Sequence, residues 1–298
     1  MFFSEEILGI VFIIQMVIGI IGNLLLLYIF IFSRGYKGKP IDLILIHLSI
    51  INILLLLFKG SSRTLTLFGI VNFLNDIGCK IMVYLDRVFW VLSFINVSLL
   101  SSFQAITISS NSSVCVMLKA KAMKYTVLSF ILCWILTLLT EAVIPIYITT
   151  LINSSSFMNN WNWGYCVFSS QATNTFNIIL WKAFHYAAWY GLTICNTIYI
   201  IFIMQSHHKR VLHIHSTSFF HSISPEIKAT KTVVILVSSF IFFHLVSFIC
   251  FLITMPSSRL TSDWMMHISA FMTGCFPTFC PFVLISSISK VSRTHFSE

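Results

Sequence analysis

Charged residues are scarce in this sequence. Only 9% of its 298 residues are Asp, Glu, Lys or Arg, whereas soluble domains carry about 25%. Because 57% of the residues are hydrophobic, so few charges could not cover the surface of a soluble core. The shortage excludes a cytosolic enzyme, a disordered chain and a secreted disulfide scaffold, and it leaves a polytopic membrane protein.

Catalytic signatures are missing as well. The sequence has no H-E-x-x-H, G-x-S-x-G or P-loop motif, and Asp86 lacks the second acid that intramembrane proteolysis would need. The five histidines between residues 205 and 231 lack Cys or acidic partners at close spacing. No cleaved signal peptide is evident, since the first apolar run is too long and acids precede it. We therefore expect no enzyme, no cofactor and no metal.

Long runs without charge locate the membrane spans. A bilayer core about 30 Å thick needs about 20 apolar residues per helix. The run that begins at Val88 extends back across Asp86 and Arg87, which gives seven runs of sufficient length. The sequence therefore predicts an all-α bundle of seven transmembrane helices in one domain, residues 1–298. The helices are expected near 7–32, 41–65, 79–107, 125–150, 177–204, 231–255 and 264–289.

The Lys and Arg residues predict the orientation of the chain. Most of them gather in the segments 33–40, 109–124, 205–231 and 290–298, which together with the adjacent Asp42 carry the entire net charge of +9. The positive-inside rule makes this side cytoplasmic and places the N-terminus outside. A basic rim beside anionic membrane lipid accounts for the charge, so nucleic acid is not expected as a partner.

The outer side holds few features. Of the eight cysteines, Cys79 and Cys166 are the two clear exterior candidates, and we expect a disulfide between them rather than two free thiols. It would hold the polar loop 153–177 over the mouth of the bundle. Asn153 begins the one N-x-[ST] motif on the side where glycosylation occurs. Since the outer loops are short, a cavity between the outer halves of the helices is the expected binding site.

Ionisable residues at membrane depth are costly and mark functional sites. Several from separate helices reach a similar depth in the outer half, and others share a helix face with them at i, i+3, i+7 spacing. The candidate ligand contacts are Asp86, Arg87, Glu141, Lys182, His185, Trp189, His267 and Phe271. The alternative is structural: Arg87 and Glu141 form a buried ion pair that fixes helix packing. His244 is expected to be a histidine of the bundle interior rather than a ligand contact.

Several stretches resemble one family, the vomeronasal type-1 receptors, which are pheromone receptors of the G-protein-coupled class. They are KPIDLIL at 39–45, SFQAITIS at 102–109, LCWIL at 132–136, GYC at 164–166, HST at 215–217, SPE at 224–226 and PFVL at 281–284. The resemblance runs from the first helix to the last, and FQAITIS is its most specific motif.

The resemblance implies a plasma-membrane receptor that binds a small pheromone-like molecule and activates a heterotrimeric G protein of the inhibitory class. The residues expected to face the G protein are Gln104, Ile108, Lys119, Lys121, Lys209, Arg210, Lys228 and Lys231. A bitter-taste-like chemosensory receptor is the nearest alternative. A small transporter or channel subunit is the alternative from another class, and it would show inverted repeats and paired helix breaks.

Overall fold

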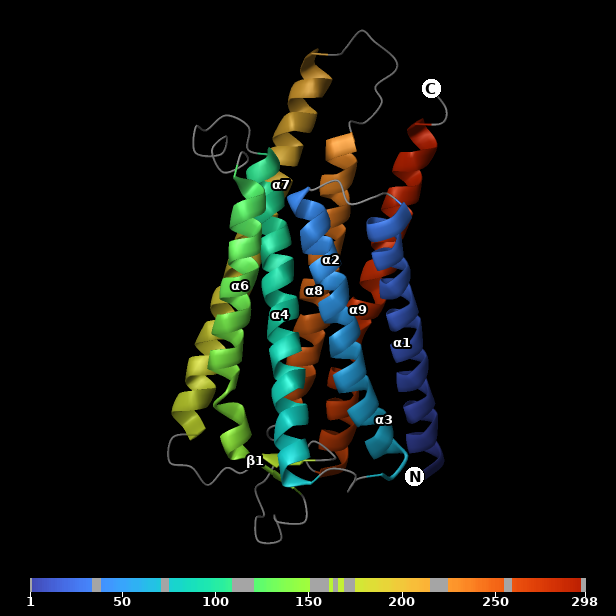
Figure 1. The fold of residues 1–298 in the computed structure, drawn as a ribbon, viewed down its shortest axis with the longest axis vertical. Coiled ribbons are helices and arrows are strands. Elements are labelled where there is room, and N and C mark those ends of the chain that lie inside the picture. Colours follow the sequence, from blue (N-terminus) through green and yellow to red (C-terminus); the bar gives the residue numbers. More distant parts are fainter. Residues whose placement is uncertain are drawn as a thin grey trace.

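Long helices run side by side through the whole molecule (Figure 1). A computed structural model describes residues 2–33, 39–70, 75–108, 121–150, 161–162, 166–168, 175–214, 225–254 and 259–295. Within these ranges, seven helical segments are long and apolar enough to cross a membrane, which confirms the expected seven-helix bundle. The first residues and a small sheet lie at one end of the bundle, and the last residues lie at the other (Figure 1). We call the first the outer end and the second the inner end, after the orientation that the basic residues predict.

The helical elements follow the charge-free runs of the sequence, because a helix satisfies its own backbone hydrogen bonds in lipid. In chain order they are α1 (Phe2–Tyr28), the π-helical turn η1 (Ile29–Ser33), α2 (Pro40–Leu55), the π-helical turn η2 (Leu56–Gly60), α3 (Ser61–Leu67), α4 (Asp76–Ile108), α6 (Ala122–Glu141), the 3-10 turn η3 (Ile144–Tyr147), α7 (Thr175–Ile214), α8 (Pro225–Thr254) and α9 (Arg259–His295). The second span is thus α2, η2 and α3 together.

Helix α4 is the centre of the bundle. In its apolar stretch 72% of the residues are buried, against 11% in α6 and 17% in α7. Helices α2, α6, α7 and α8 all contact it. Polar side chains on α4 must therefore find partners inside the protein, whereas α6 and α7 present most of their surface to lipid.

Three phenylalanines pack the middle of the bundle. Phe94 of α4 and Phe240 of α8 have ring centroids 4.6 Å apart, and Phe276 of α9 lies 4.8 Å from Phe240, both in edge-to-face geometry. Close packing of this kind holds membrane helices together, since lipid removes most of the hydrophobic driving force between them. It couples α4, α8 and α9 in one contact.

Buried amides and a histidine also join the helices. Asn23 of α1 donates to the carbonyl of Pro277 in α9 at 2.8 Å, and Asn52 donates to Asn23 Oδ1 at 3.3 Å. His47 Nε2 accepts from the Trp134 indole at 2.9 Å, so the proton of its ring sits on Nδ1, which donates to Asn96 Oδ1 at 2.7 Å. This bond set ties α2 to α4 and α6.

The fourth span differs from the expectation. It was expected to continue to residue 150, but α6 ends at Glu141 and is followed by η3 and the strand β1 (Ile148–Thr150). Pro145 lies in η3. Proline lacks a backbone N–H and disfavours α-helical geometry in the residue before it, which explains why the α-helix does not extend through this segment.

Two glycines allow a direct test of helix packing. A Cβ on Gly22 of α1 would lie 2.9 Å from Pro281 Cγ in α9, whereas nothing lies within 4 Å of a Cβ on Gly191. We expect Gly22→Ala to lower the thermal midpoint of the purified receptor in detergent, because overpacking costs about 1–3 kcal/mol. Gly191→Ala is the matched control and is expected to raise it slightly, since alanine favours helix by up to about 1 kcal/mol. Equal midpoints would contradict the close approach of α1 to α9.

Candidate functional site

The outer end of the bundle is covered by a three-stranded sheet. Its strands are β1, β2 (Trp161–Asn162) and β3 (Cys166–Phe168), with β3 in the centre and antiparallel to both neighbours. A disulfide joins Cys79, near the start of α4, to Cys166 in β3, with Cα atoms 5.9 Å apart. The bond fixes the sheet to the central helix, and Figure 1 shows β1 beside that end of α4. A ligand cavity beneath it would therefore have a fixed cover.

A buried ion pair lies between α6 and α7 in the outer half. Lys182 Nζ is 2.6 Å from Glu141 Oε1 and donates a second hydrogen bond to the carbonyl of Thr140 at 2.7 Å. Glu141 is fully buried. The sequence-based pairing of Arg87 with Glu141 is therefore wrong. Helix α7 brings Lys182 to the carboxylate, and the sequence gives no information on that neighbour relation.

Arg87 lies beside the Trp90 ring on α4. Its guanidinium carbon is 5.7 Å from the ring centroid of Trp90, one helical turn deeper on α4. Trp90 also contacts Tyr186 of α7 and His244 of α8, with centroid distances of 5.1 and 5.8 Å. A cation above an aromatic face is attracted to it. The Arg87 guanidinium and the Trp90 ring thus place one positive charge and one large aromatic surface in the outer half of the bundle.

Aromatic rings close the bottom of this region. Trp90 stacks edge-to-face on Phe94, which contacts Tyr190, Phe240 and His244 at centroid distances of 4.5–4.6 Å. We call these five side chains the aromatic floor: Trp90, Phe94, Tyr190, Phe240 and His244. Rings from α4, α7 and α8 take part, so any molecule resting on the floor contacts three helices together.

Several buried polar side-chain atoms in the same half of the bundle have no hydrogen-bond partner among the described residues. In the described part of the chain they include one atom from each of five helices, α4, α6, α7, α8 and α9: Asp86 Oδ1, Glu141 Oε2, His185 Nδ1, His244 Nε2 and His267 Nδ1. A buried polar atom without a partner costs about 1–3 kcal/mol. Their convergence in one half of the bundle is typical of a site that polar ligand groups or water complete.

Trp189 and Phe271, two of the predicted ligand contacts, pack against other side chains of the protein. Trp189 donates to His185 Nε2 at 3.3 Å and therefore orients that ring. Phe271 packs edge-to-face against Phe12 of α1, with centroids 6.0 Å apart, in a separate apolar cluster with Leu67 and Ala270. The structure thus brings Asp86, Arg87, Glu141, Lys182, His185 and His267 to the outer half, while Phe271 faces α1.

Sequence reasoning missed Trp90 and Tyr186 and treated Lys59 and Arg63 only as interruptions of the second helix. The signal for Trp90 was its spacing, since a residue four after Asp86 and three after Arg87 shares a helix face with them. Lys59 and Arg63 are likewise four residues apart and therefore share a helix face. The contact of Trp90 with Tyr186 joins α4 to α7, however, and could not be read from one chain segment.

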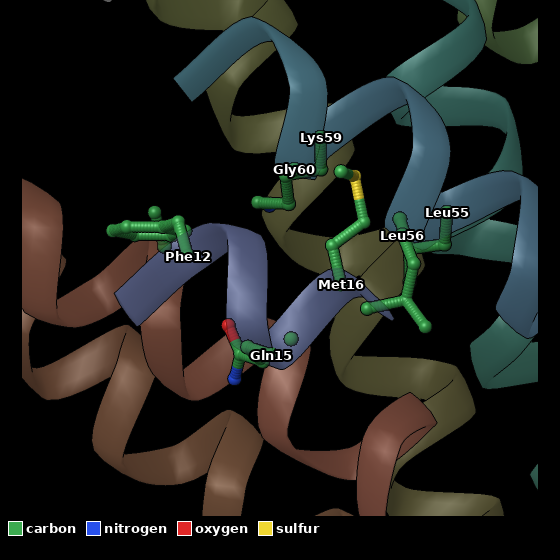
Figure 2. A pocket seen from close by; sticks show the side chains of 9 residues that line it. Phe12, Gln15, Met16, Leu55, Leu56, Lys59 and Gly60 are labelled. Carbon is green, nitrogen blue, oxygen red and sulfur yellow. The ribbon is translucent and has the colours of Figure 1, made fainter. Parts of the chain in front are cut away.

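A small cavity lies beside the polar site, between α1, η2 and α9. Figure 2 shows the residues around it, among them Gln15, Met16, Lys59 and Gly60. Its volume of about 10 Å³ corresponds to about one water molecule. It is too small for an organic ligand, so it is a side recess of the outer half rather than the ligand site.

The inner end contains the residues expected to face a G protein. Gln104 is only 4% exposed and lies inside the bundle, whereas Lys121 and Lys231 are exposed. Ile108, Lys209, Arg210 and Lys228 belong to the inner ends of α4, α7 and α8. Lys119, like Asn153 on the outer side, lies outside the described residues.

Comparison with known proteins gives one consistent match. The model of the vomeronasal organ pheromone receptor family matches residues 6–297. Human vomeronasal type-1 receptor 4 is 35% identical over 95% of this chain and 95% of its own length, and human vomeronasal type-1 receptor 2 is 35% identical over 94% of this chain and 71% of its own. The crystal structure of squid rhodopsin superimposes with a TM-score of 0.71 at 14% identity, over 95% of this chain and 81% of that one. The rhodopsin likeness concerns the fold alone.

Proposed function

The chain belongs to the vomeronasal organ pheromone receptor family, and on that premise we propose that it binds a small pheromone-like molecule above the aromatic floor and activates an inhibitory-class G protein. Membership confirms the resemblance found in the sequence. It makes the chain a chemosensory G-protein-coupled receptor rather than an enzyme. With its seven spans, the chain is a multi-pass protein of the plasma membrane.

The observation that carries the binding proposal is the set of unpartnered polar atoms in the outer half. They come from five helices and include both carboxylate and imidazole atoms. A ligand that supplies hydrogen bonds to them recovers the free energy that unpaired buried atoms cost. The disulfide holds β3 against α4 at the same end of the bundle.

The aromatic floor supplies the proposed route from ligand to G protein. Trp90 and Phe94 of α4 touch His244 and Phe240 of α8, and Phe240 packs in turn on Phe276 of α9. A ligand that binds better when these rings separate shifts the population toward a bundle with α8 displaced. The inner ends of α7 and α8 then change their spacing, which couples the two ends of the receptor.

The orientation belongs to the same proposal. The sheet and the N-terminus face the extracellular side, and the basic inner end faces the cytoplasm. The G protein is proposed to contact Ile108 with the inner lysines and Arg210, and Gln104 once the helices separate. Glycosylation is proposed at Asn153.

The test is a ligand screen in cells that express the full chain with an inhibitory-class G protein and an N-terminal tag. We expect a response that pertussis toxin abolishes. With the active compound of that screen, Trp90→Leu is expected to raise the half-maximal concentration at least about tenfold, or about 1.4 kcal/mol, without loss of tag signal on intact cells. Trp264→Leu, at a half-exposed tryptophan of α9, is the matched control and should leave the response unchanged. A toxin-insensitive response, or equal potency in both variants, would contradict the proposal.

A further inference from the structure

Three hydroxyl groups join α8 to α9 in the outer half of the bundle. We call them the outer hydroxyl cluster: Ser247, Ser269 and Thr273. The Ser247 hydroxyl donates to the Ser269 carbonyl at 3.0 Å, and the Ser269 hydroxyl donates to the Ser247 carbonyl at 2.9 Å. The Thr273 hydroxyl oxygen lies 2.9 Å from Ser247 Oγ. Because small residues let two helix backbones approach closely, these reciprocal bonds fix the height of α8 against α9.

A second hydroxyl pair joins the same two helices at the inner end. The hydroxyl oxygens of Thr232 and Ser287 are 2.7 Å apart, and we call these two residues the inner hydroxyl pair. They lie at the inner limits of the two apolar spans, and both are half-buried. Water at the membrane boundary can therefore replace this bond at a small net cost.

Helix α9 is also bonded to α1. Asn23 donates to the Pro277 carbonyl at 2.8 Å. This is the carbonyl that the residue four positions later would normally bond, but that residue is Pro281, which has no N–H. Gln15 donates to the Phe271 carbonyl at 3.0 Å. Helix α1 thus supports α9 at its prolines, and this makes α9 the fixed member of the α8–α9 pair.

Helix α8 is continuous between its two connections to α9. It is α-helical over Pro225–Thr254 and has no proline or glycine after its first residue. Sharp bends in helices occur chiefly at proline, at glycine or at bulges. We therefore expect α8 to move as one rod.

The aromatic floor meets this rod near the middle. Phe240 contacts Phe94 of α4 at a centroid distance of 4.6 Å. At 1.5 Å per residue, Phe240 lies about 10 Å inward of Ser247, and Thr232 lies about 22 Å inward of Ser247. If α8 turns about Ser247, a displacement at Phe240 is therefore about doubled at Thr232.

We propose that α8 turns as one rod about the outer hydroxyl cluster, and that the inner hydroxyl pair holds the resting arrangement until the rings of the aromatic floor separate. The inference rests on the proposed function and deepens it, since it names the pivot and the contact that breaks between the ligand site and the G-protein site. A ligand that separates Phe94 from Phe240 shifts the population toward the arrangement with Thr232 and Ser287 apart.

The first measurement needs neither a ligand nor a G protein. The purified full chain in nanodiscs carries Leu236→Cys, at a side chain only 1% exposed in the inner half of α8, and is treated with N-ethylmaleimide. Mass spectrometry follows labelling at position 236 and at the native Cys250, which is buried near the outer end of α8. We expect Thr232→Val to accelerate labelling at position 236 about two- to tenfold, as loss of one hydrogen bond predicts, and to leave Cys250 unchanged.

Two further variants complete this measurement. Ser239→Ala is the matched control, because the Ser239 hydroxyl bonds to the Leu236 carbonyl within α8, and it should change neither rate. Ser247→Ala with Ser269→Ala removes the reciprocal bonds of the outer cluster and is expected to accelerate labelling at Cys250.

The labelling rates decide both parts of the inference. Equal acceleration at position 236 and Cys250 after Thr232→Val would mean that α8 separates from α9 along its whole length, and it would overturn the pivot. An unchanged rate at position 236 would overturn the inner pair as the holding contact. If Leu236→Cys yields no folded receptor, Val233→Cys, at a side chain 3% exposed, takes its place.

The second measurement is basal nucleotide exchange on a purified inhibitory-class heterotrimer. We expect Thr232→Val to exceed the unmodified receptor at least about twofold, and Ser239→Ala to equal it. Equal exchange by Thr232→Val and an active unmodified receptor would overturn the inner pair as the contact that controls coupling. Accelerated labelling without any exchange would contradict the proposed inhibitory-class coupling and leave the pivot standing.

Discussion

Lys182→Met is expected to remove most of the receptor from the cell surface. The substitution leaves the fully buried Glu141 carboxylate without its 2.6 Å partner. Loss of one member of a buried pair costs about 3–5 kcal/mol, which is a large share of the total stability of about 5–15 kcal/mol. The measurement is an N-terminal tag quantified on intact cells, together with the thermal midpoint in detergent.

A double-mutant cycle tests the pair itself. Glu141→Gln with Lys182→Met leaves no unpaired charge and is expected to be more stable than Lys182→Met alone. The exchange Glu141→Lys, Lys182→Glu should restore part of the surface level, because opposite charges again face each other.

Two further substitutions test the Glu141–Lys182 pair: Lys80→Gln is the matched control, and Arg87→Gln tests the alternative partner of Glu141. Asp76 and Lys80 form a pair four residues apart, with more than a third of each side chain exposed, so Lys80→Gln should cost only about 0.2–1 kcal/mol. Arg87→Gln is expected to cost less than Lys182→Met, since Arg87 is not the partner of Glu141. If Lys182→Met costs no more than Lys80→Gln, the pair is not buried; if Arg87→Gln costs as much as Lys182→Met, the assignment of the partner is wrong.

Removal of the Cys79–Cys166 disulfide is expected to lower the stability of the receptor strongly as well. The bond joins residues 87 positions apart and fixes β3 to α4. Loss of a native disulfide costs about 2–5 kcal/mol, chiefly because the unfolded chain regains freedom. Cys79→Ser and Cys166→Ser are each expected to lower surface level and thermal midpoint, and the double variant should be no worse than either single one, since one bond is lost in all three.

Reduction provides an independent measurement. Dithiothreitol should lower the thermal midpoint of the unmodified receptor and leave the serine variants unchanged. Cys195→Ser, at an exposed cysteine that is free in the structure, is the matched control and is expected to have no effect. Additive losses from Cys79→Ser and Cys166→Ser would contradict a shared bond.

The spans were predictable because the membrane imposes them. A stretch of about 20 apolar residues must be helical in lipid, so the seven runs appear as helices with shifts of a few residues at most ends. The early end of α6 had a visible cause in Pro145. The π-helical turn at Leu56–Gly60 had no such cause in the sequence; it lies where Gly60 approaches Met16 of α1.

The depth of a polar residue in the membrane and the identity of its ion-pair partner are determined by different features of the protein. The sequence places Glu141, Lys182 and Arg87 at similar depth, since about 1.5 Å per residue fixes height along a helix. It leaves open which two meet, because that depends on helix order and rotation about each axis. The structure decides both: α7 brings Lys182 to Glu141, while the α4 face turns Arg87 to Trp90.

The sequence by itself determined the class of protein, the number of spans, the family resemblance and the pair of exterior cysteines. Each follows from composition, run length or a local motif, which need no knowledge of neighbours. Only the tertiary structure decided the Glu141–Lys182 pair and the aromatic floor. These depend on contacts between helices that are distant in the chain, and packing in the bundle fixes them after the spans have formed.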